Sequence, residues 1–176
     1  MTSYTERYAI AKTLEKQMLF KLNTYQPFTY FDIQNEVELP SCAYFQSKHK
    51  YTKFDFYNNY ITLELKSRTN PFMVGCTNLL DTHKIINNHS IFLFTYLNAS
   101  HKLNEMHFIE YKPDLFETFY IRQYGIDNLF VIPSENTIRL DSLDSHNIMI
   151  RYTEEYKDKL NELIEMDNYN YTLRGN

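Results

Sequence analysis

Apolar residues near the N-terminus recur at alternating spacings of four and three, which predicts a first helix. The stripe consists of Tyr4, Tyr8, Ala11, Glu15, Met18 and Leu22, and is widened by Leu14 and Leu19. Ser3 or Thr5 can cap this helix, and Glu6 stands three residues after Ser3, as in a capping box. Glu15 interrupts the apolar stripe. A carboxylate there is costly unless it is paired or binds a metal.

Two β-rich runs, KFDFY (53–57) and YITLELKSR (60–68), predict a hairpin with its turn centred on Asn58-Asn59. Side chains alternate along a strand, so this hairpin has one apolar and one polar face. The apolar face carries Phe54, Phe56, Ile61, Leu63 and Leu65. The polar face carries Lys53, Asp55, Tyr57, Thr62, Glu64, Lys66 and Arg68.

The predicted turn sets the strand register, which pairs Tyr57 with Tyr60 and makes Asp55 and Glu64 diagonal neighbours. Their backbones are then roughly 7 Å apart. Two carboxylates at that spacing can share a divalent metal ion, and their hard oxygens suit Mg²⁺ or Mn²⁺ rather than Zn²⁺. Lys66 lies on the same face, where its ammonium can reach a water or a phosphate at the metal.

The rest of the chain alternates between strand-like and helix-like segments. The pattern predicts a helix over 77–87, strands at 91–97 and 106–111, a helical turn at 113–119, strands near 120–124 and 129–133, and a closing helix from Thr153. This order predicts an α/β or α+β fold in which helices flank a mixed central sheet. We expect a single domain over residues 1–176, with a short polar tail from about residue 167.

Composition narrows the function classes. The 176 residues include only 3 Gly, so the clustered glycines of dinucleotide-binding and phosphate-binding loops are absent. The net charge of -4 gives no overall basic field, which argues only weakly against a nucleic-acid partner. Two cysteines do not make a disulfide framework, and no apolar run is long enough for a membrane span. We therefore expect an intracellular protein without a membrane partner.

The helix acid and the hairpin together resemble the PD-(D/E)xK nuclease superfamily, which has the restriction-endonuclease-like fold. That motif has an acid on the first core helix, an Asp at the start of the second strand and (D/E)-x-K on the third. Asp55 stands at the Asp position, after Phe54 where the family has Pro, and Glu64-Leu65-Lys66 matches (D/E)-x-K. Residues 53–75 also look like small nuclease-like proteins of phages and large DNA viruses.

Within this resemblance, Glu15 fits the helix acid best, and Glu6 is the alternative. The resemblance implies a metal-dependent endonuclease that hydrolyses DNA, with Lys66 as the catalytic lysine. One or two Mg²⁺ (or Mn²⁺) ions would be held by Glu15, Asp55, Glu64 and the backbone carbonyl of Leu65. Phosphates would be bound by Lys50, Lys53, Arg68 and Lys84. Small nucleases of this type often dimerise to cut both strands, so a homodimer is also implied.

Other interpretations of the same residues remain open. An amphipathic hairpin with a solvated face also shows Asp, Glu and Lys, and E-x-K is often a salt-bridge ladder. The chain is then a non-catalytic nucleic-acid-binding or assembly protein with the same fold. An RNA endonuclease of the cap-snatching type shares the metal chemistry but usually adds a His ligand. The pairs His83/His89 and His101/His107 are each six residues apart, a poor spacing for two ligands on one helix face.

Overall fold

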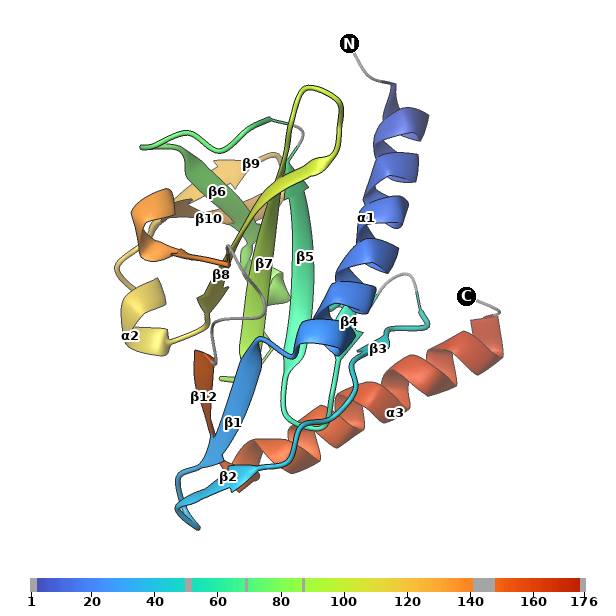
Figure 1. Ribbon diagram of the computed structural model, residues 1–176, viewed down its shortest axis with the longest axis vertical. Coiled ribbons are helices and arrows are strands. Elements are labelled where there is room, and N and C mark those ends of the chain that lie inside the picture. Colours follow the sequence, from blue (N-terminus) through green and yellow to red (C-terminus); the bar gives the residue numbers. More distant parts are fainter. Residues whose placement is uncertain (1–2, 50–51, 69, 87, 141–147, 175–176) are drawn as a thin grey trace.

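The computed structural model describes residues 3–49, 52–68, 70–86, 88–140 and 148–174, and has an α+β fold (Figure 1). Long helices stand near the two ends of the chain, and three β-sheets lie between them. The helices are α1 (Tyr4–Tyr25), α2 (Pro113–Phe116) and α3 (Lys157–Arg174), with short 3-10 helices η1 (Thr82–Lys84), η2 (Ser134–Asn136) and η3 (Glu154–Tyr156). None of the helices in these ranges is long and apolar enough to cross a membrane.

The largest sheet has six strands in the order β11-β8-β7-β5-β4-β3. Its strands are β3 (Phe45–Gln46), β4 (Phe56–Tyr57), β5 (Thr62–Arg68), β7 (Ser90–Leu97), β8 (Leu103–Glu110) and β11 (Ile138–Arg139). β5 and β7 run parallel, and every other neighbouring pair in this sheet is antiparallel. The sheet is therefore mixed, as the order of elements predicted.

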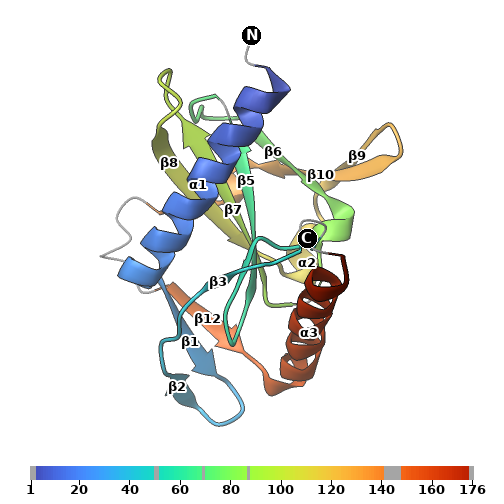
Figure 2. The same ribbon diagram turned by 90° about the vertical axis from the view of Figure 1, so that its right-hand side faces the viewer.

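Two three-stranded sheets complete the fold. The first is β12-β1-β2, built from β1 (Phe28–Asp32), β2 (Val37–Leu39) and β12 (Ile148–Tyr152). The second, here called the small sheet, is β6-β10-β9, built from β6 (Thr77–Asp81), β9 (Tyr120–Tyr124) and β10 (Asp127–Pro133). Figure 2 shows the β9–β10 hairpin of the small sheet extending away from α1.

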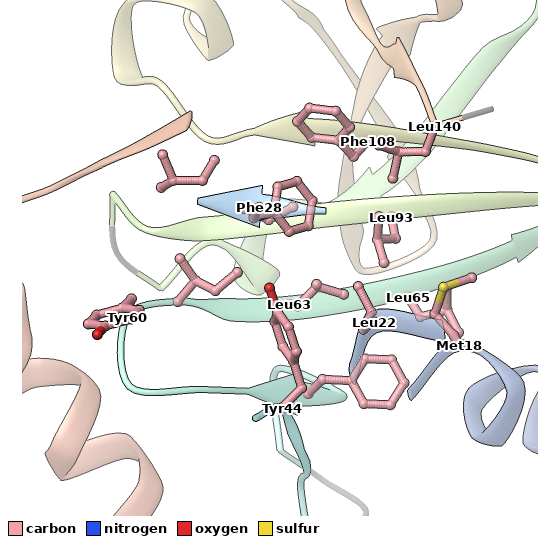
Figure 3. Close-up of a cluster of buried hydrophobic side chains, with 14 of the residues drawn as sticks. Met18, Leu22, Phe28, Tyr44, Tyr60, Leu63, Leu65, Leu93, Phe108 and Leu140 are labelled. Carbon is pink, nitrogen blue, oxygen red and sulfur yellow. The ribbon is translucent and has the colours of Figure 1, made fainter. Parts of the chain in front are cut away.

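The six-stranded sheet is buried on both faces. On one face, Met18 and Leu22 of α1 pack with Leu63, Leu65 and Leu93 of the sheet (Figure 3). On the other face, the core cluster comprises Leu80, Phe92, Phe94, Tyr96, Ile109, Phe116 and Ile132. All eight residues of β7 are buried, as expected for a central strand covered from both sides. The alternation along β5 therefore turns Glu64 and Lys66 away from α1 and towards the small sheet.

The first helix is confirmed, together with its capping box. The Ser3 side chain accepts a hydrogen bond from the backbone of Glu6, and the Glu6 carboxylate accepts one from the backbone of Ser3. Burial begins only at Leu14, and Tyr4 and Tyr8 are 78% and 56% exposed, so the start of the predicted stripe does not face the core. The physical reason is that α1 leans away from β5 towards its N-terminus (Figure 1).

The helix predicted over 77–87 is wrong. Residues Thr77–Asp81 form strand β6, and only Thr82–Lys84 are helical, as η1. β6 pairs with β10, with Leu80 opposite Phe130, and Leu80 is fully buried against the second core cluster. Pairing with a strand some fifty residues later overrides the local helical pattern.

Phe56, Ile61, Leu63 and Leu65 lie on the apolar face as predicted, but Phe54 packs on the Tyr57 ring instead, and the register of the hairpin is wrong by two residues. The structure pairs Phe56 with Leu63 and Tyr57 with Thr62, instead of Phe56 with Ile61 and Tyr57 with Tyr60. The turn is wider because Asn58 Oδ1 accepts hydrogen bonds from the backbones of Tyr60 and Ile61. The Tyr60 ring packs on the rings of Tyr30 and Tyr152, so this residue is not a strand partner.

The stretch from Asp167, expected as a polar tail, continues α3 as far as Arg174. The closing helix itself is preceded by η3, and Leu160 is its most buried apolar residue, at 2% exposure. Asp167 is also buried, at 3% exposure, which shows that this segment packs against the rest of the chain.

Candidate active site

Asp55 immediately precedes β4 and lies beside β5, the strand that carries Glu64. β4 is only two residues long and pairs with Thr62 and Leu63, so the rest of β5 has no β4 partner along this edge. At this edge the Asp55 carboxylate accepts a hydrogen bond from the backbone N–H of Leu65, at 2.7 Å. A residue's N–H and C=O point to the same side of a strand, so the Leu65 carbonyl lies at this edge too. The hairpin thus brings Asp55 close to Glu64 and Leu65, although the register that predicted Asp55 and Glu64 as diagonal neighbours is wrong.

Glu64 is the centre of a charged cluster. Its side chain is buried, and its Oε1 lies 2.9 Å from Lys84 Nζ and 3.2 Å from Lys66 Nζ. Lys66 Nζ also lies 3.7 Å from the Asp81 carboxylate. The second oxygen, Oε2, is buried and has no hydrogen-bond partner among the described residues. A buried carboxylate oxygen without a protein partner is costly, and an ordered water or a bound cation would satisfy it.

The acidity of Asp55 differs sharply from that of an exposed carboxylate. Burial, and next the negative charge of Glu64, raise the pKa of Asp55 to about 7. The Leu65 N–H and the ammonium groups of Lys84 and Lys66 act in the opposite direction but do not outweigh those effects. Ionising Asp55 at neutral pH is therefore costly, mainly because the carboxyl is buried and secondly because Glu64 is negative, unless a further cation binds beside it.

Two members of this cluster come from the connection between β5 and β7. Lys84 lies at the end of η1 rather than on the predicted helix, but it does reach the site. Asp81, at the end of β6, is a site residue that the sequence pattern did not indicate. The predicted helix over 77–87 gave no reason to place Asp81 in the site. In the structure Asp81 ends strand β6, and its carboxylate lies near Lys66.

Glu15 does not join the two carboxylates. Its Oε2 accepts hydrogen bonds from Lys12 Nζ at 2.9 Å and from Gln46 Nε2 at 3.0 Å. The bond to Glu15 raises the pKa of Lys12. No three His, Cys, Asp or Glu side chains in the described part of the chain are grouped closely enough to hold a metal ion. Lys12 and Gln46 thus offset the cost of a carboxylate on this helix.

If the chain cleaves DNA as the resemblance implies, Glu15→Gln should keep cleavage within about threefold of the unmodified protein and leave any response of the melting temperature to Mg²⁺ unchanged. The loss of one partly exposed ion pair should lower the free energy of unfolding by only about 0.5–1 kcal/mol. Cleavage rates and thermal melts with and without Mg²⁺ measure both effects. If the Mg²⁺-induced rise in melting temperature disappeared in this variant, Glu15 would belong to the metal site after all.

The remaining candidates for phosphate binding are placed differently from one another. Lys53 is exposed and lies two residues before Asp55. Arg68 turns towards β6, where it contacts Asn78 Oδ1 at 3.4 Å and the carbonyl of Thr77. These contacts orient Arg68 away from a role in the cluster around Glu64. Lys50 lies outside the described residues, and Glu6 is used in the cap of α1.

The four histidines singled out by their spacing, which are among the described residues, are placed away from this cluster. His107 contacts Glu105 at 2.8 Å and Thr137 at 2.9 Å, and His89 stacks on Tyr152. His83 and His101 are exposed. This placement agrees with the interpretation of the histidines as structural or solvent-exposed residues.

Asp167 anchors the loop that leads into the site. Its carboxylate accepts the backbone N–H groups of Lys48 at 2.8 Å and His49 at 2.9 Å, and it also contacts the Thr52 hydroxyl. The loop then continues through Lys53 to Asp55. The sequence shows only an acidic residue in a polar segment near the C-terminus. That its side chain is buried is visible only in the folded chain.

We expect Asp167→Asn to lower the free energy of unfolding by about 1–3 kcal/mol, because an amide has one acceptor oxygen where the carboxylate uses two. Urea denaturation measures this change. Glu165→Gln, at an exposed position of the same helix, is the matched control and should change stability by less than about 0.5 kcal/mol. Equal effects of the two substitutions would show that Asp167 does not anchor the loop.

Comparison of the chain with protein-family models gives no match, and a search of curated proteins finds no significant match either.

Proposed function

We propose that this chain is a metal-dependent nuclease that hydrolyses DNA phosphodiester bonds and has a restriction-endonuclease-like core. The observation that carries the proposal is the cluster formed by Asp55, which immediately precedes β4, with Glu64 and Lys66 of β5. The order of elements supports it as well: α1, the β4–β5 hairpin, and a crossover from β5 to the parallel strand β7. A homodimer that cuts both strands is part of the same proposal, by analogy with the superfamily.

The donor set at the β5 edge fits Mg²⁺ or Mn²⁺. Mg²⁺ is commonly bound by one or two carboxylates and keeps several waters, so a third carboxylate is not required. Asp55, Glu64 Oε2 and the Leu65 carbonyl are the oxygens that would hold it. The unpartnered Oε2 of Glu64 and the raised pKa of Asp55 both indicate that a cation would relieve an unfavourable arrangement. When bound, the ion would activate water and stabilise negative charge on the phosphate.

The lysines supply the other requirement of phosphodiester hydrolysis, which is positive charge near the anionic phosphate. Lys66 projects from the same face of β5 as Glu64 and is held between Glu64 and Asp81. We assign to Lys66 the orientation of the attacking water and the neutralisation of charge in the transition state. Lys84, which contacts Glu64, and Lys53, which is exposed two residues before Asp55, are assigned to phosphate binding.

A non-catalytic nucleic-acid-binding protein with the same fold is the second candidate. The specific observation in its favour is that two lysines already neutralise Glu64, so the cluster also works as a closed ion-pair network. Such a network stabilises a fold without any chemistry. In that case nucleic acid would bind to the lysines and remain intact.

Incubation with supercoiled plasmid, single-stranded DNA and single-stranded RNA, each with Mg²⁺, Mn²⁺ or EDTA, tests the proposal. We expect cleavage of DNA with Mg²⁺ or Mn²⁺, none with EDTA, and none by Asp55→Ala under any condition. Cleavage of RNA alone would assign the cap-snatching type of substrate. Binding without cleavage of any substrate would favour the non-catalytic candidate.

A further inference from the structure

A pocket of about 490 Å³ opens beside the candidate active site, between α3, the loop before β4 and the end of η1. Its apolar lining comes from Phe54, Ile85, Ile86, Leu163 and Met166. The Asp167 carboxylate, although part of the wall, is already engaged by the loop that it anchors. The volume falls in the range of pockets that bind small organic groups.

The pocket and the charged cluster are continuous along the chain. Phe54 in the pocket precedes Asp55, and Ile85 in the pocket follows Lys84. Consecutive Cα atoms are about 3.8 Å apart, so the pocket begins within one residue of the cluster on two separate segments. A group attached next to a phosphate at Lys84 would therefore lie close to the mouth of the pocket.

The chemistry of the lining suits one part of a nucleotide. The lining combines five apolar side chains with polar ones, among them the ammonium groups of Lys53 and Lys159. A nucleobase is a flat group with apolar faces, and it is covalently joined to phosphates that favour ammonium groups. We propose that this pocket receives an unpaired nucleobase next to the phosphate that lies at Lys66 and Lys84. The proposal rests on the proposed function, whose substrate class it specifies.

The consequence is a preference for single strands or for unpaired bases. A base inside a duplex is stacked and paired, and it enters a protein pocket only after it has been extruded from the helix at a cost in free energy. In a single strand the base is not paired, so the free-energy cost of moving it into a pocket is smaller. The structure therefore assigns single-stranded nucleic acid, or a locally opened duplex, as the substrate.

Fluorescence anisotropy in EDTA tests base binding without cleavage. The two ligands are a labelled single-stranded 12-mer of DNA and a 12-mer of the same backbone in which every nucleotide is abasic. Their charges are equal, so the ratio of their dissociation constants isolates the contribution of the bases. We expect the unmodified protein to bind the base-bearing strand at least about tenfold more tightly, as for one stacked base. It should also bind that strand more tightly than the matching 12-bp duplex.

Met166→Glu places a carboxylate in the pocket at a residue that is 59% exposed, so folding should not be affected. We expect this variant to reduce the ratio to about one. Leu173→Glu makes the same change in charge on the same helix, at a residue that is 64% exposed and does not line the pocket. This control should keep the ratio of the unmodified protein.

Three results would overturn the pocket assignment: a ratio near one in the unmodified protein, an equal loss of the ratio in both variants, or tighter binding of the duplex than of the single strand. The cleavage assay is read separately. If the ratio is high and depends on Met166 but no DNA is cut, the pocket stands and the nuclease assignment falls. If DNA is cut and the ratio is near one, the reverse holds.

Discussion

Asp55→Asn should abolish cleavage and at the same time stabilise the metal-free protein above pH 7. The folded chain keeps the Asp55 proton up to about pH 7, whereas the unfolded chain loses it near the ordinary pKa of 3.8. The stability that the protonated carboxyl contributes is therefore fully present below about pH 4 and is lost as the pH rises to 7. Asn keeps an oxygen that can accept the Leu65 N–H but carries no charge. Its advantage at pH 8 should be roughly 2–4 kcal/mol.

Thermal melts in EDTA at pH 5 and pH 8 measure this difference. The unmodified protein should lose stability between the two pH values, relative to Asp55→Asn, and Mg²⁺ at pH 8 should restore it only in the unmodified protein. A metal ion binds the ionised carboxylate, so the rise in melting temperature with Mg²⁺ should also be larger at pH 8 than at pH 5. A variant that melts identically to the unmodified protein at both pH values would contradict the raised pKa.

Glu64→Gln should abolish cleavage as well, but it should destabilise the metal-free protein. Its carboxylate neutralises Lys66 and Lys84, whose side chains are only 29% and 18% exposed. Removing that charge leaves the partly buried Lys84 without this counter-ion and Lys66 with only its longer pair to Asp81, at a cost of about 2 kcal/mol or more. The two acidic residues are thus expected to have the same effect on activity and opposite effects on stability. If the cluster is only a structural ion-pair network, the unmodified protein should show no rise in melting temperature with Mg²⁺, and neither variant should change that.

Lys66→Ala should lower the cleavage rate by about 10²- to 10³-fold without loss of metal binding. An ammonium group is not a metal ligand, and its removal leaves Glu64 more negative. Isothermal titration calorimetry should therefore show a Mg²⁺ affinity equal to or higher than that of the unmodified protein. Lys84→Ala should mainly weaken substrate binding, which appears as a higher KM.

Lys157→Ala is the matched control for both lysine variants. Lys157 is 54% exposed on α3 and forms only a long ion pair, of 3.8 Å, with Glu154. It should keep the rate and the KM of the unmodified protein. If Lys66→Ala unfolded and lost its affinity for Mg²⁺, the role of Lys66 would be the support of Glu64 and not catalysis.

Local patterns predicted much of this structure correctly. The capping box at Ser3 and Glu6 depends on residues three positions apart, so no distant contact is needed to form it. The two faces of the β4–β5 hairpin follow from strict alternation, which survives a shift of two residues in register. For the same reason Asp55, Glu64 and Lys66 could be assigned to one site before their distances were known.

Tertiary contacts decided what local patterns could not. The segment 77–81 has the apolar residues of a helix, but β10 supplies a hydrogen-bonding partner, and β6 forms instead. That choice brings Asp81 to Lys66 and places Lys84 on Glu64. In the sequence, an acidic residue on the apolar stripe of the first helix is compatible with a metal site and with an ion pair. The contacts of Glu15 with Lys12 and Gln46 become visible only in the folded chain.

The sequence by itself therefore determined the start of α1, the mixed order of elements and the pairing of two carboxylates with a lysine. Each of these depends on neighbours within a few residues or on a single hairpin. The tertiary structure alone decided that Asp167 anchors the loop before Asp55 and that α3 closes a pocket beside the site, because these contacts join residues that are distant in the sequence, up to 119 positions apart. Such contacts depend on how the layers pack, and no local spacing along the chain records that packing.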